Sequence, residues 1–473
     1  MMLPMGAARA TPEGLGLRMA LVMSPPVAQQ SDAVLRTSAS ATPWPDLLAW
    51  AHTQAPSNRV ADAGAQAALA QGRQAWSTAW MPRLDASAGA NRQQQTYNGL
   101  AIRTPASSVS LTATLPLWRA ADRAVARAQS AAAEQTLWQA RNARSRVARE
   151  LSRAYLAAVE QAEQMRLTES QQQGLLELTQ VNDRRLKAGV GTVLDVLETR
   201  IRVDQTRAAV QDYRTRLVTQ RLTLLRLTGQ GNITLPAGLL PTLVKLPLVV
   251  PPREQAVTVA LDRNPQLQEA QAQVVSAKAT TDARDGERWH PTVDAVALAS
   301  RSRQTQQFDG NSEQQNITTR SIGVQINWPL FTGGFQHQRV QEAAALLTQS
   351  EAQRDDARTQ LDANLNDAYQ SLEQLNRVIA VQRQVEQSAM ASAEAVRKAF
   401  MAGMRTNLDV LNAQQQVYAT RQSLVTTRVN ALSAQVDILA LLDQLDAPTV
   451  APLMAAVDTR ALPDHPTSEL VTP

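Results

Sequence analysis

Apolar positions recur at spacings of three and four residues along two long proline-free tracts, 117–235 and 330–447. This spacing places apolar side chains on one face of a helix, and the many small residues allow neighbouring helices to approach closely. The tracts are therefore predicted to form long coiled-coil helices. The stripe consists of Val147, Leu151, Ala154, Ala158, Ala162 and Met165 in the first tract, and of Leu361, Leu365, Ala368, Leu372, Leu375 and Ile379 in the second.

Each tract is interrupted once, at 187–192 and at 401–406, by a glycine that is followed by a threonine. Glycine is typical just past a helix end and threonine is typical of the next N-cap, so each tract is predicted to be an antiparallel helical hairpin. The first arm, about 119–187, would be on the order of 100 Å long at 1.5 Å per residue. The return arms, 193–228 and 407–445, are about half as long. Helical segments at 253–287 and about 46–76 would complete them.

The chain is an internal duplication, because Tyr155 and Tyr369, Gly189 and Gly403, and Asp195 and Asp409 are each separated by the same 214 positions. We therefore expect repeats at 46–228 and 253–446, each with a helix, two strands and a long hairpin. Residues 1–45 are expected to be a signal or disordered segment, although their apolar run is short for a signal peptide. Residues 229–252 are expected to form a proline-rich connection between the repeats, at the equator of the long helices. Residues 447–473 are expected to be a tail.

Short alternating segments precede each hairpin. Apolar and polar residues alternate over 109–115 and 322–328, with weaker partner strands at 83–91 and 292–301, and polar loops are expected at 93–104 and 304–319. One apolar and one polar face is what a barrel wall between lipid and water requires, although two soluble hairpins would show the same alternation. Four strands cannot close a barrel, so several chains would have to share one wall. Trp118, Trp328 and Phe331 are candidates for its aromatic girdle, with core packing as the alternative.

Composition excludes several other classes of protein. The chain has no cysteine and four scattered histidines, so thiolate or helical zinc sites, disulfides and thiol nucleophiles are not expected. Its 47 basic residues are interleaved with 42 acidic ones, which is typical of solvated helix faces, and no nucleic-acid partner is expected. No apolar stretch reaches the ~18 residues of a membrane-spanning helix. Without phosphate-binding or nucleophile-elbow motifs, an enzyme is the poorest fit, and no cofactor is expected.

Together these features resemble the TolC family of outer-membrane channel-tunnel proteins. The resemblance covers about 46–445 and is carried by the duplication, by 324–334 (Val-Gln-Ile-Asn-Trp-Pro-Leu-Phe-Thr-Gly-Gly), and by the hairpin sequences at 191–197 and 405–413. It implies a mainly helical fold with a membrane β-barrel portion. A homotrimer would form a 12-stranded barrel in outer-membrane lipid and a helical tunnel across the periplasm.

The resemblance also implies a passive export duct that docks with a periplasmic adaptor (a membrane fusion protein) and an inner-membrane pump, expected to be an ABC transporter. Lacking a lipid-acceptor cysteine, the chain is more similar to the type I secretion branch, which includes partners of repeat-toxin exporters, than to the lipid-anchored drug-efflux branch. A multidrug efflux component is the alternative. A periplasmic adaptor or coiled-coil scaffold is more distant, because an adaptor should contain one hairpin with β-rich modules.

The resemblance further implies a periplasmic gate near the hairpin turns. Asp409 matches a carboxylate of the family's acidic ring, Arg405 a gate-bonding arginine and Asp195 its acidic partner. Asn412 stands where a second ring aspartate is expected, and Phe400 replaces a gate tyrosine, so fewer polar bonds are expected to hold the gate. Both aspartates could equally be ordinary carboxylates of a helix N-terminus. The adaptor is expected to dock at the turns, through Gly189, Val190, Gly191, Thr192, Gly403, Met404 and Thr406.

Overall fold

The computed structural model describes residues 41–97, 100–230, 233–239, 247–308 and 311–461. Most of the predicted N-terminal segment, up to residue 40, and the end of the predicted tail, 462–473, lie outside the described residues. None of the described helices contains a stretch long and apolar enough to cross a membrane.

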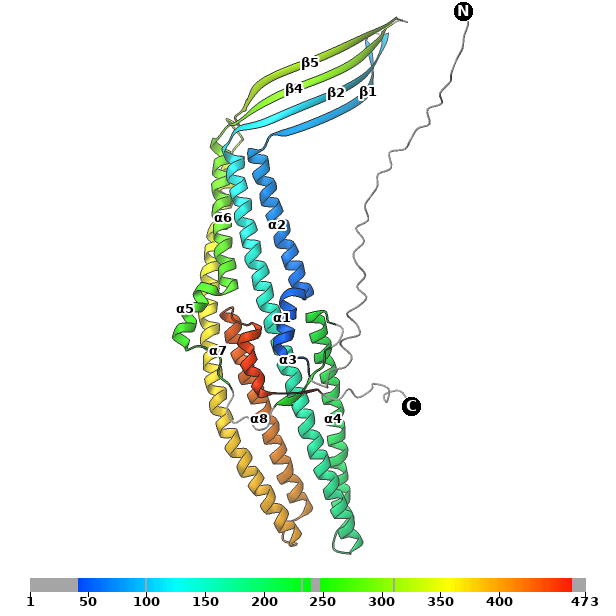
Figure 1. The fold of residues 1–473 in the computed structure, drawn as a ribbon, viewed down its shortest axis with the longest axis vertical. Coiled ribbons are helices and arrows are strands. Elements are labelled where there is room, and N and C mark those ends of the chain that lie inside the picture. Colours follow the sequence, from blue (N-terminus) through cyan, green and yellow to red (C-terminus); the bar gives the residue numbers. More distant parts are fainter. Residues whose placement is uncertain (1–40, 98–99, 231–232, 240–246, 309–310, 462–473) are drawn as a thin grey trace, which may run out of the picture. The chain divides into compact units, whose positions relative to one another are not determined.

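The described residues contain two copies of one helix and strand order (Figure 1). Corresponding elements have nearly equal lengths, so the duplication predicted from residue spacing is present in the fold. The first copy consists of α1 (Trp44–Gln54), α2 (Pro56–Trp80), β1 (Arg83–Tyr97), β2 (Leu100–Arg119), α3 (Ala120–Lys187) and α4 (Val193–Thr228). The second consists of α5 (Arg253–Arg263), α6 (Pro265–Trp289), β4 (Thr292–Phe308), β5 (Asn311–Asn327), α7 (Phe335–Met401) and α8 (Asn407–Leu441).

Each continuous helix expected before the strands is in fact two helices, broken before a proline. Pro56 is the first residue of α2 and Pro265 the first of α6. Proline has no backbone N–H to donate and restricts the residue before it to extended conformations, so a helix ends there and a new one begins. The side-chain oxygen of Asn264 caps α6 by accepting a hydrogen bond from the Leu267 N–H at 3.0 Å.

The long helices pack side by side in an order that follows the duplication. The 68-residue α3 packs against α2 and α6 along one part of its length and against α4 and α8 along the other. The 67-residue α7 packs against α6 and α8. Thus α3 is central, whereas α7 on one side and α2 with α4 on the other form the edges of the layer.

The predicted apolar stripes line the interior of this layer. Val147, Leu151, Tyr155, Ala158 and Ala162 are buried in one core that includes residues of α1, α4 and α8. Leu361, Leu365, Leu372 and Ile379 of α7 are buried in a second core with residues of α5, α6 and α8. At about 1.5 to 3 kcal/mol for each large apolar side chain buried, these stripes are a principal source of hairpin stability.

A short second sheet packs against α3, and the sequence pattern did not predict it. Strand β3 (Pro236–Leu239) pairs with β6 (Val457–Ala461), which follows α9 (Ala447–Val450) and the 3₁₀ turn η1 (Ala451–Ala456). Gly238 has a φ of 142° and approaches α3 so closely that a Cβ would meet the Glu163 carboxylate at 2.5 Å. The Glu163 carboxylate also accepts a hydrogen bond from the Leu239 N–H at 3.3 Å.

The main sheet has four antiparallel strands in the order β1-β2-β4-β5. The polar segments predicted as loops, 93–104 and 304–319, are mostly strand, because β1 continues to Tyr97, β2 starts at Leu100, β4 continues to Phe308 and β5 starts at Asn311. Glutamine, serine and threonine there gave no apolar alternation to recognise. Strand pairing satisfies their backbone groups whatever the side chains are, so the ladder extends past the apolar region.

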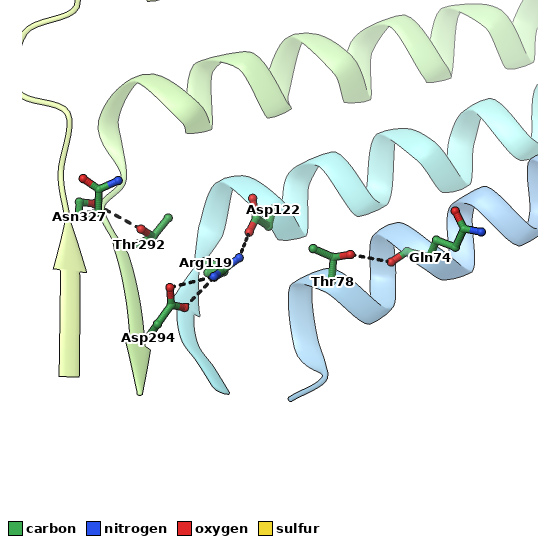
Figure 2. Close-up of polar contacts among 7 residues, drawn as sticks. All are labelled: Gln74, Thr78, Arg119, Asp122, Thr292, Asp294 and Asn327. Carbon is green, nitrogen blue, oxygen red and sulfur yellow. Dashed lines mark hydrogen bonds and ion pairs between the residues drawn. The ribbon is translucent and has the colours of Figure 1, made fainter. Parts of the chain in front are cut away.

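A charged clamp joins the sheet to the helices (Figure 2). The Arg119 guanidinium, at the end of β2, donates to both carboxylate oxygens of Asp294 on β4, at 2.7 and 2.8 Å, and to Asp122 in the first turn of α3 at 3.0 Å. A bidentate arginine–carboxylate pair fixes direction as well as distance. Arg119 therefore ties the two repeats together where the strands become helices.

Candidate gate and docking surface at the hairpin turns

The two hairpin turns have the same backbone design. Gly189 and Gly403 adopt left-handed φ values of 74° and 78°. The Val190 N–H donates to the Arg185 carbonyl at 3.0 Å, and the Met404 N–H donates to the Ala399 carbonyl at 2.9 Å. These bonds, with a shorter-range one from each glycine N–H, form the Schellman motif that ends a helix at a left-handed glycine. The predicted glycine turns are thus confirmed in both repeats.

Each return helix begins with a capping box. The Thr192 hydroxyl accepts from the Asp195 N–H at 3.1 Å, and the Asp195 carboxylate accepts from the Thr192 N–H at 3.0 Å. Thr406 and Asp409 make the same pair of bonds at 3.2 and 3.0 Å. Both predicted gate carboxylates are therefore bonded within their own turns, which is the local role of an acidic residue at a helix N-terminus.

The charge beside the second turn is largely open to solvent. Hydrogen bonds from the Thr406 N–H and hydroxyl, together with the positive charge of Arg405, lower the pKa of Asp409 below its ordinary value. Arg405 and Asn412 are exposed, and neither side chain bonds to another described residue within the chain. The predicted pairing of Arg405 with Asp195 is therefore not made inside one chain, and a pairing between chains stays a prediction.

Phe400 is only 5 % exposed, at the end of α7. The Arg185 guanidinium of α3 lies 4.7 Å from its ring centroid, a cation–π contact between the two hairpins of one chain. Phenylalanine cannot donate the hydroxyl hydrogen bond expected of a tyrosine at this position. The structure shows that it still links the hairpins, through an arginine that the sequence analysis did not select.

A buried polar cluster joins the hairpins a few residues from the turns and was also missed. The Asn182 amide of α3 donates to the Thr199 hydroxyl of α4 and to the Asn407 Oδ1 of α8, both at 2.9 Å. The Asn407 amide donates to the Asp195 carbonyl at 3.2 Å. All three side chains are at most 1 % exposed. We call Asn182, Thr199 and Asn407 the hairpin cluster.

The duplication contained a signal for this cluster. At the matching positions of the other repeat stand Val396, Ala413 and Val193. Polar residues that replace apolar ones at the seam of a coiled coil must find partners when buried, and they commonly fix which helices associate. Comparison of the two repeats, position by position, would have indicated these three residues.

The residues expected to meet an adaptor are mostly at the surface. Val190 and Met404 are 66 % and 74 % exposed. Gly189, Thr192, Gly403 and Thr406 are exposed, and Gly191 is half-buried, with no room for a Cβ beside the Leu186 backbone nitrogen. The two turns thus present a compatible surface, and adaptor docking stays a prediction.

The aromatic residues at the sheet ends are also exposed, which argues against packing in a core. Trp118, Trp328 and Phe331 are 49 %, 56 % and 90 % exposed. Trp80 ends α2 and Trp289 ends α6, so each of the four junctions between helix and strand carries a tryptophan. Sequence analysis found two of the four. Aromatic residues are typical of the boundary between a membrane and water, and the girdle itself stays a prediction.

Comparison with known proteins adds to these observations. The family model described as "Outer membrane efflux protein" matches residues 47–230 and 256–444. A membrane protein of known structure from Pseudomonas aeruginosa superimposes with a TM-score of 0.72 at 20% identity, over 88% of this chain and 96% of that one. The likeness in structure covers most of both chains and shows a common fold.

Three curated relatives match parts of the chain. The alkaline protease secretion protein AprF of Pseudomonas aeruginosa is 28% identical over 273 residues, 57% of this chain and 56% of the relative. The outer membrane efflux protein BepC of Brucella suis is 29% identical over 244 residues, 51% of each. The proteases secretion protein PrtF of Dickeya chrysanthemi is 31% identical over 134 residues, 28% of each. The chain thus spans about half the length, or less, of the curated relatives it matches.

The family match covers well over half of the chain, and the duplication, the twin hairpins and the four-stranded sheet agree with it. The chain therefore belongs to the outer membrane efflux protein family, whose fold is that of channel-tunnel proteins, and it is a protein of the bacterial outer membrane that extends into the periplasm.

Proposed function

We propose that three copies of this chain assemble into one passive export duct. The proposal rests on one observation: among the described residues, the main sheet has two open edges, and so does the helical layer. Within the part of the chain that the structure describes, strands β1 and β5 each pair with one strand only, and α7 on one side and α2 with α4 on the other form the edges of the helical layer. An open strand edge is not tolerated in lipid, so the edge of one copy must pair with the other edge of the next.

Exposed apolar side chains on both helical edges support this head-to-tail closure. Val381 and Leu346 of α7 are 61 % and 50 % exposed, and Leu222 and Ile201 of α4 are 59 % and 57 % exposed. An association between two different surfaces closes into a ring when the rotation between copies permits it. Three copies would supply twelve strands, enough for a closed barrel, and would bring the hairpin turns of all copies together at one end.

At that end we propose a gate in which Asp195, Asp409 and Arg405 of neighbouring copies face one another. The partly exposed carboxylates and the exposed arginine are available for bonds between copies, because none of them is used between the hairpins of one chain. Asn412 would line the same opening. The exposed turns would receive a periplasmic adaptor connected to an inner-membrane pump, which would supply the energy.

We propose a secreted protein as the cargo, with an ABC transporter as the pump. The names of AprF and PrtF state secretion of proteases, which supports type I secretion for this chain. Small-molecule efflux is the second candidate, favoured by the name of BepC. Expression in a Gram-negative host that lacks its own channel, with either a secretion or an efflux adaptor and pump, separates them: secreted protein in the medium supports the first, and recovered drug resistance supports the second.

The assembly is tested on detergent-extracted protein by mass measurement and by conductance in planar bilayers. We expect a trimer and a small conductance that increases when Arg405 is replaced by Gln, because fewer charged bonds would then hold the tip. A monomer without conductance would overturn the proposal. Arg358→Gln, an exposed position on α7 far from the turns, is the matched control and should leave the conductance unchanged.

A further inference from the structure

The described carboxylates of the main sheet lie on one face, where Arg83 and Arg119 pair with them, and four other arginines lie on the opposite face. Residues opposite each other in the register share a face, and successive residues alternate between faces. On one face, which we call the apolar face, a row across the four strands consists of Leu84, Ala113, Ala297 and Ile322. The next row on this face, toward the strand tips, consists of Ala86, Leu111, Ala299 and Arg320. The carboxylates of Asp85 and Asp294 lie on the opposite face by the same alternation.

Arginines gather on the apolar face where its apolar rows end. Arg301 stands in the row of Val109, Arg303 in the row of Ser107, and Arg92 two residues beyond Ala90 on β1. With Arg320 these form a group of four exposed arginines, which we call the arginine belt. None is ion-paired with a carboxylate among the described residues, and Arg303 donates only to the Asn316 side chain, at 3.1 Å.

Two hollows lie along this face, with the row of Ala88, Val109 and Arg301 between them. One, of about 430 Å³, is lined by Arg92 and Arg303 together with Ser107 and Thr305. The other, of about 440 Å³ and nearer the helices, is lined by Leu84, Leu111 and Ile322, with Arg320 at its edge. The basic, hydroxyl-bearing hollow suits the headgroup of an anionic lipid, and the apolar hollow suits its acyl chains.

The spacing from the tryptophans places the arginine belt at a membrane boundary. At ~3.4 Å per residue and a tilt of ~40°, Arg320 lies roughly 21 Å above Trp328 along the membrane normal, and the row of Arg303 lies roughly 31 Å above it. The apolar band of an outer-membrane barrel is about 25 Å high. With the tryptophans at the periplasmic boundary, Arg301 and Arg303 therefore stand at the level of the outer-leaflet headgroups. Arg320 stands roughly 4 Å below that level, within reach of its long side chain.

We propose that Arg92, Arg301, Arg303 and Arg320 bind the phosphate groups of an anionic lipid in the outer leaflet, whose acyl chains lie against Leu84, Leu111 and Ile322. The inference rests on the proposed function, because it requires this face to meet lipid. Arginine suits the role because its planar guanidinium binds phosphate through two parallel N–H donors and is always charged. Unpaired arginines beside hydrocarbon would otherwise face lipid without a counter-charge.

The test is a titration of the full-length, detergent-purified protein with bis-phosphorylated lipid A and with the same glycolipid after removal of its phosphates. The parent should bind the phosphorylated lipid at least about tenfold more tightly, since basic residues near an anionic surface each favour the charged lipid. Replacing all four arginines by Gln should abolish this preference. Replacing them by Lys should retain part of it, because the charge remains and the bidentate geometry is lost.

The matched control replaces four exposed helix arginines, Arg59, Arg73, Arg207 and Arg358, by Gln and should bind like the parent. A preference for the phosphorylated lipid that survives in the four-Gln belt variant would overturn the proposal. Displacement of the lipid by millimolar inorganic phosphate would overturn the commitment to a lipid. Trimer mass and conductance are measured on the same samples, so failure of the proposed function, with no trimer or channel in the parent, is distinguished from failure of the lipid site.

Discussion

The two hairpin tips of one chain have the same backbone and different interiors. Both end the outgoing helix at a left-handed glycine and begin the return helix with a threonine–aspartate capping box. The first hairpin then buries Asn182 and Thr199, where the second has Val396 and Ala413. Short-range sequence therefore determines the turn, whereas the buried seam determines how one hairpin associates with the other.

The same contrast extends along the long arms. Helix α3 is covered on both sides by its own chain and has buried residues along most of its length, whereas α7 has few and forms an edge. The polar cluster lies where α3, α4 and α8 meet, which is the contact between the two repeats. The two repeats thus differ in sequence where they contact each other within the chain.

The largest expected effect is that of removing one member of the hairpin cluster. Asn407→Val removes the Oδ1 to which the buried Asn182 amide donates and leaves the Thr199 hydroxyl and the Asp195 carbonyl as its other acceptors. A buried donor that loses a partner costs about 1 to 3 kcal/mol. The hairpins of one chain should separate at their tips. Because the chain has no cysteine, spin labels on cysteines introduced at Val190 and Met404 can report this separation as a broader distance distribution.

The control is the triple variant Asn182→Val, Thr199→Ala and Asn407→Val, which gives the cluster the residues of the opposite repeat. Replacing a whole buried polar group by apolar residues is often nearly neutral, so the triple variant should lose less than Asn407→Val alone. A triple variant with wider tips than the single one would show that the cluster holds the hairpins by direct attraction rather than by satisfaction of buried groups.

Much of the structure of the two hairpins could be predicted from sequence, because it depends on local features. The glycine turns, the caps and the apolar stripes are local features, and the structure confirms them at Gly189, Thr192 and Leu151. The distal halves of the strands were missed because their polar side chains carry no periodic signal. The contact of Arg185 with Phe400 and the hairpin cluster depend on which helices become neighbours, and no spacing along one helix contains that information.

The next largest effect should come from the turn glycines, and it should be equal in the two hairpins. An alanine at Gly189 or Gly403 must adopt a left-handed conformation, which costs about 1 to 2 kcal/mol. Backbone amides of the last turn before each glycine should then exchange hydrogen faster. Gly174→Ala, in the middle of α3 with open space for a Cβ, is the control and should slow exchange, since alanine favours a helix by about 0.5 to 1 kcal/mol over glycine. A slower exchange in Gly189→Ala would contradict the strained turn.

A smaller effect is expected from the caps. Thr192→Ala and Thr406→Ala each remove the hydroxyl that accepts the N–H of the following aspartate, a loss of about 1 kcal/mol. Exchange should increase only in the first turn of α4 or α8, respectively. Thr215→Ala, on the exposed face of α4, removes a hydroxyl that caps nothing and should leave both turns unchanged. Faster exchange in only one of the two cap variants would contradict the equivalence of the two tips.

The smallest effect is one of pH and concerns the second tip. The pKa of Asp409 is lowered from about 3.8 by the Thr406 hydrogen bonds and by Arg405. Its contribution to stability is therefore fully present above the unfolded value and is lost as the pH falls through the lower folded value. A spin label on a cysteine at Met404 should become more mobile below about pH 4. In Asp409→Asn this change should be absent, and in Arg405→Gln it should begin at slightly higher pH, because the positive charge that favours the ionised carboxylate is gone. An unchanged transition in Asp409→Asn would assign it to another carboxylate.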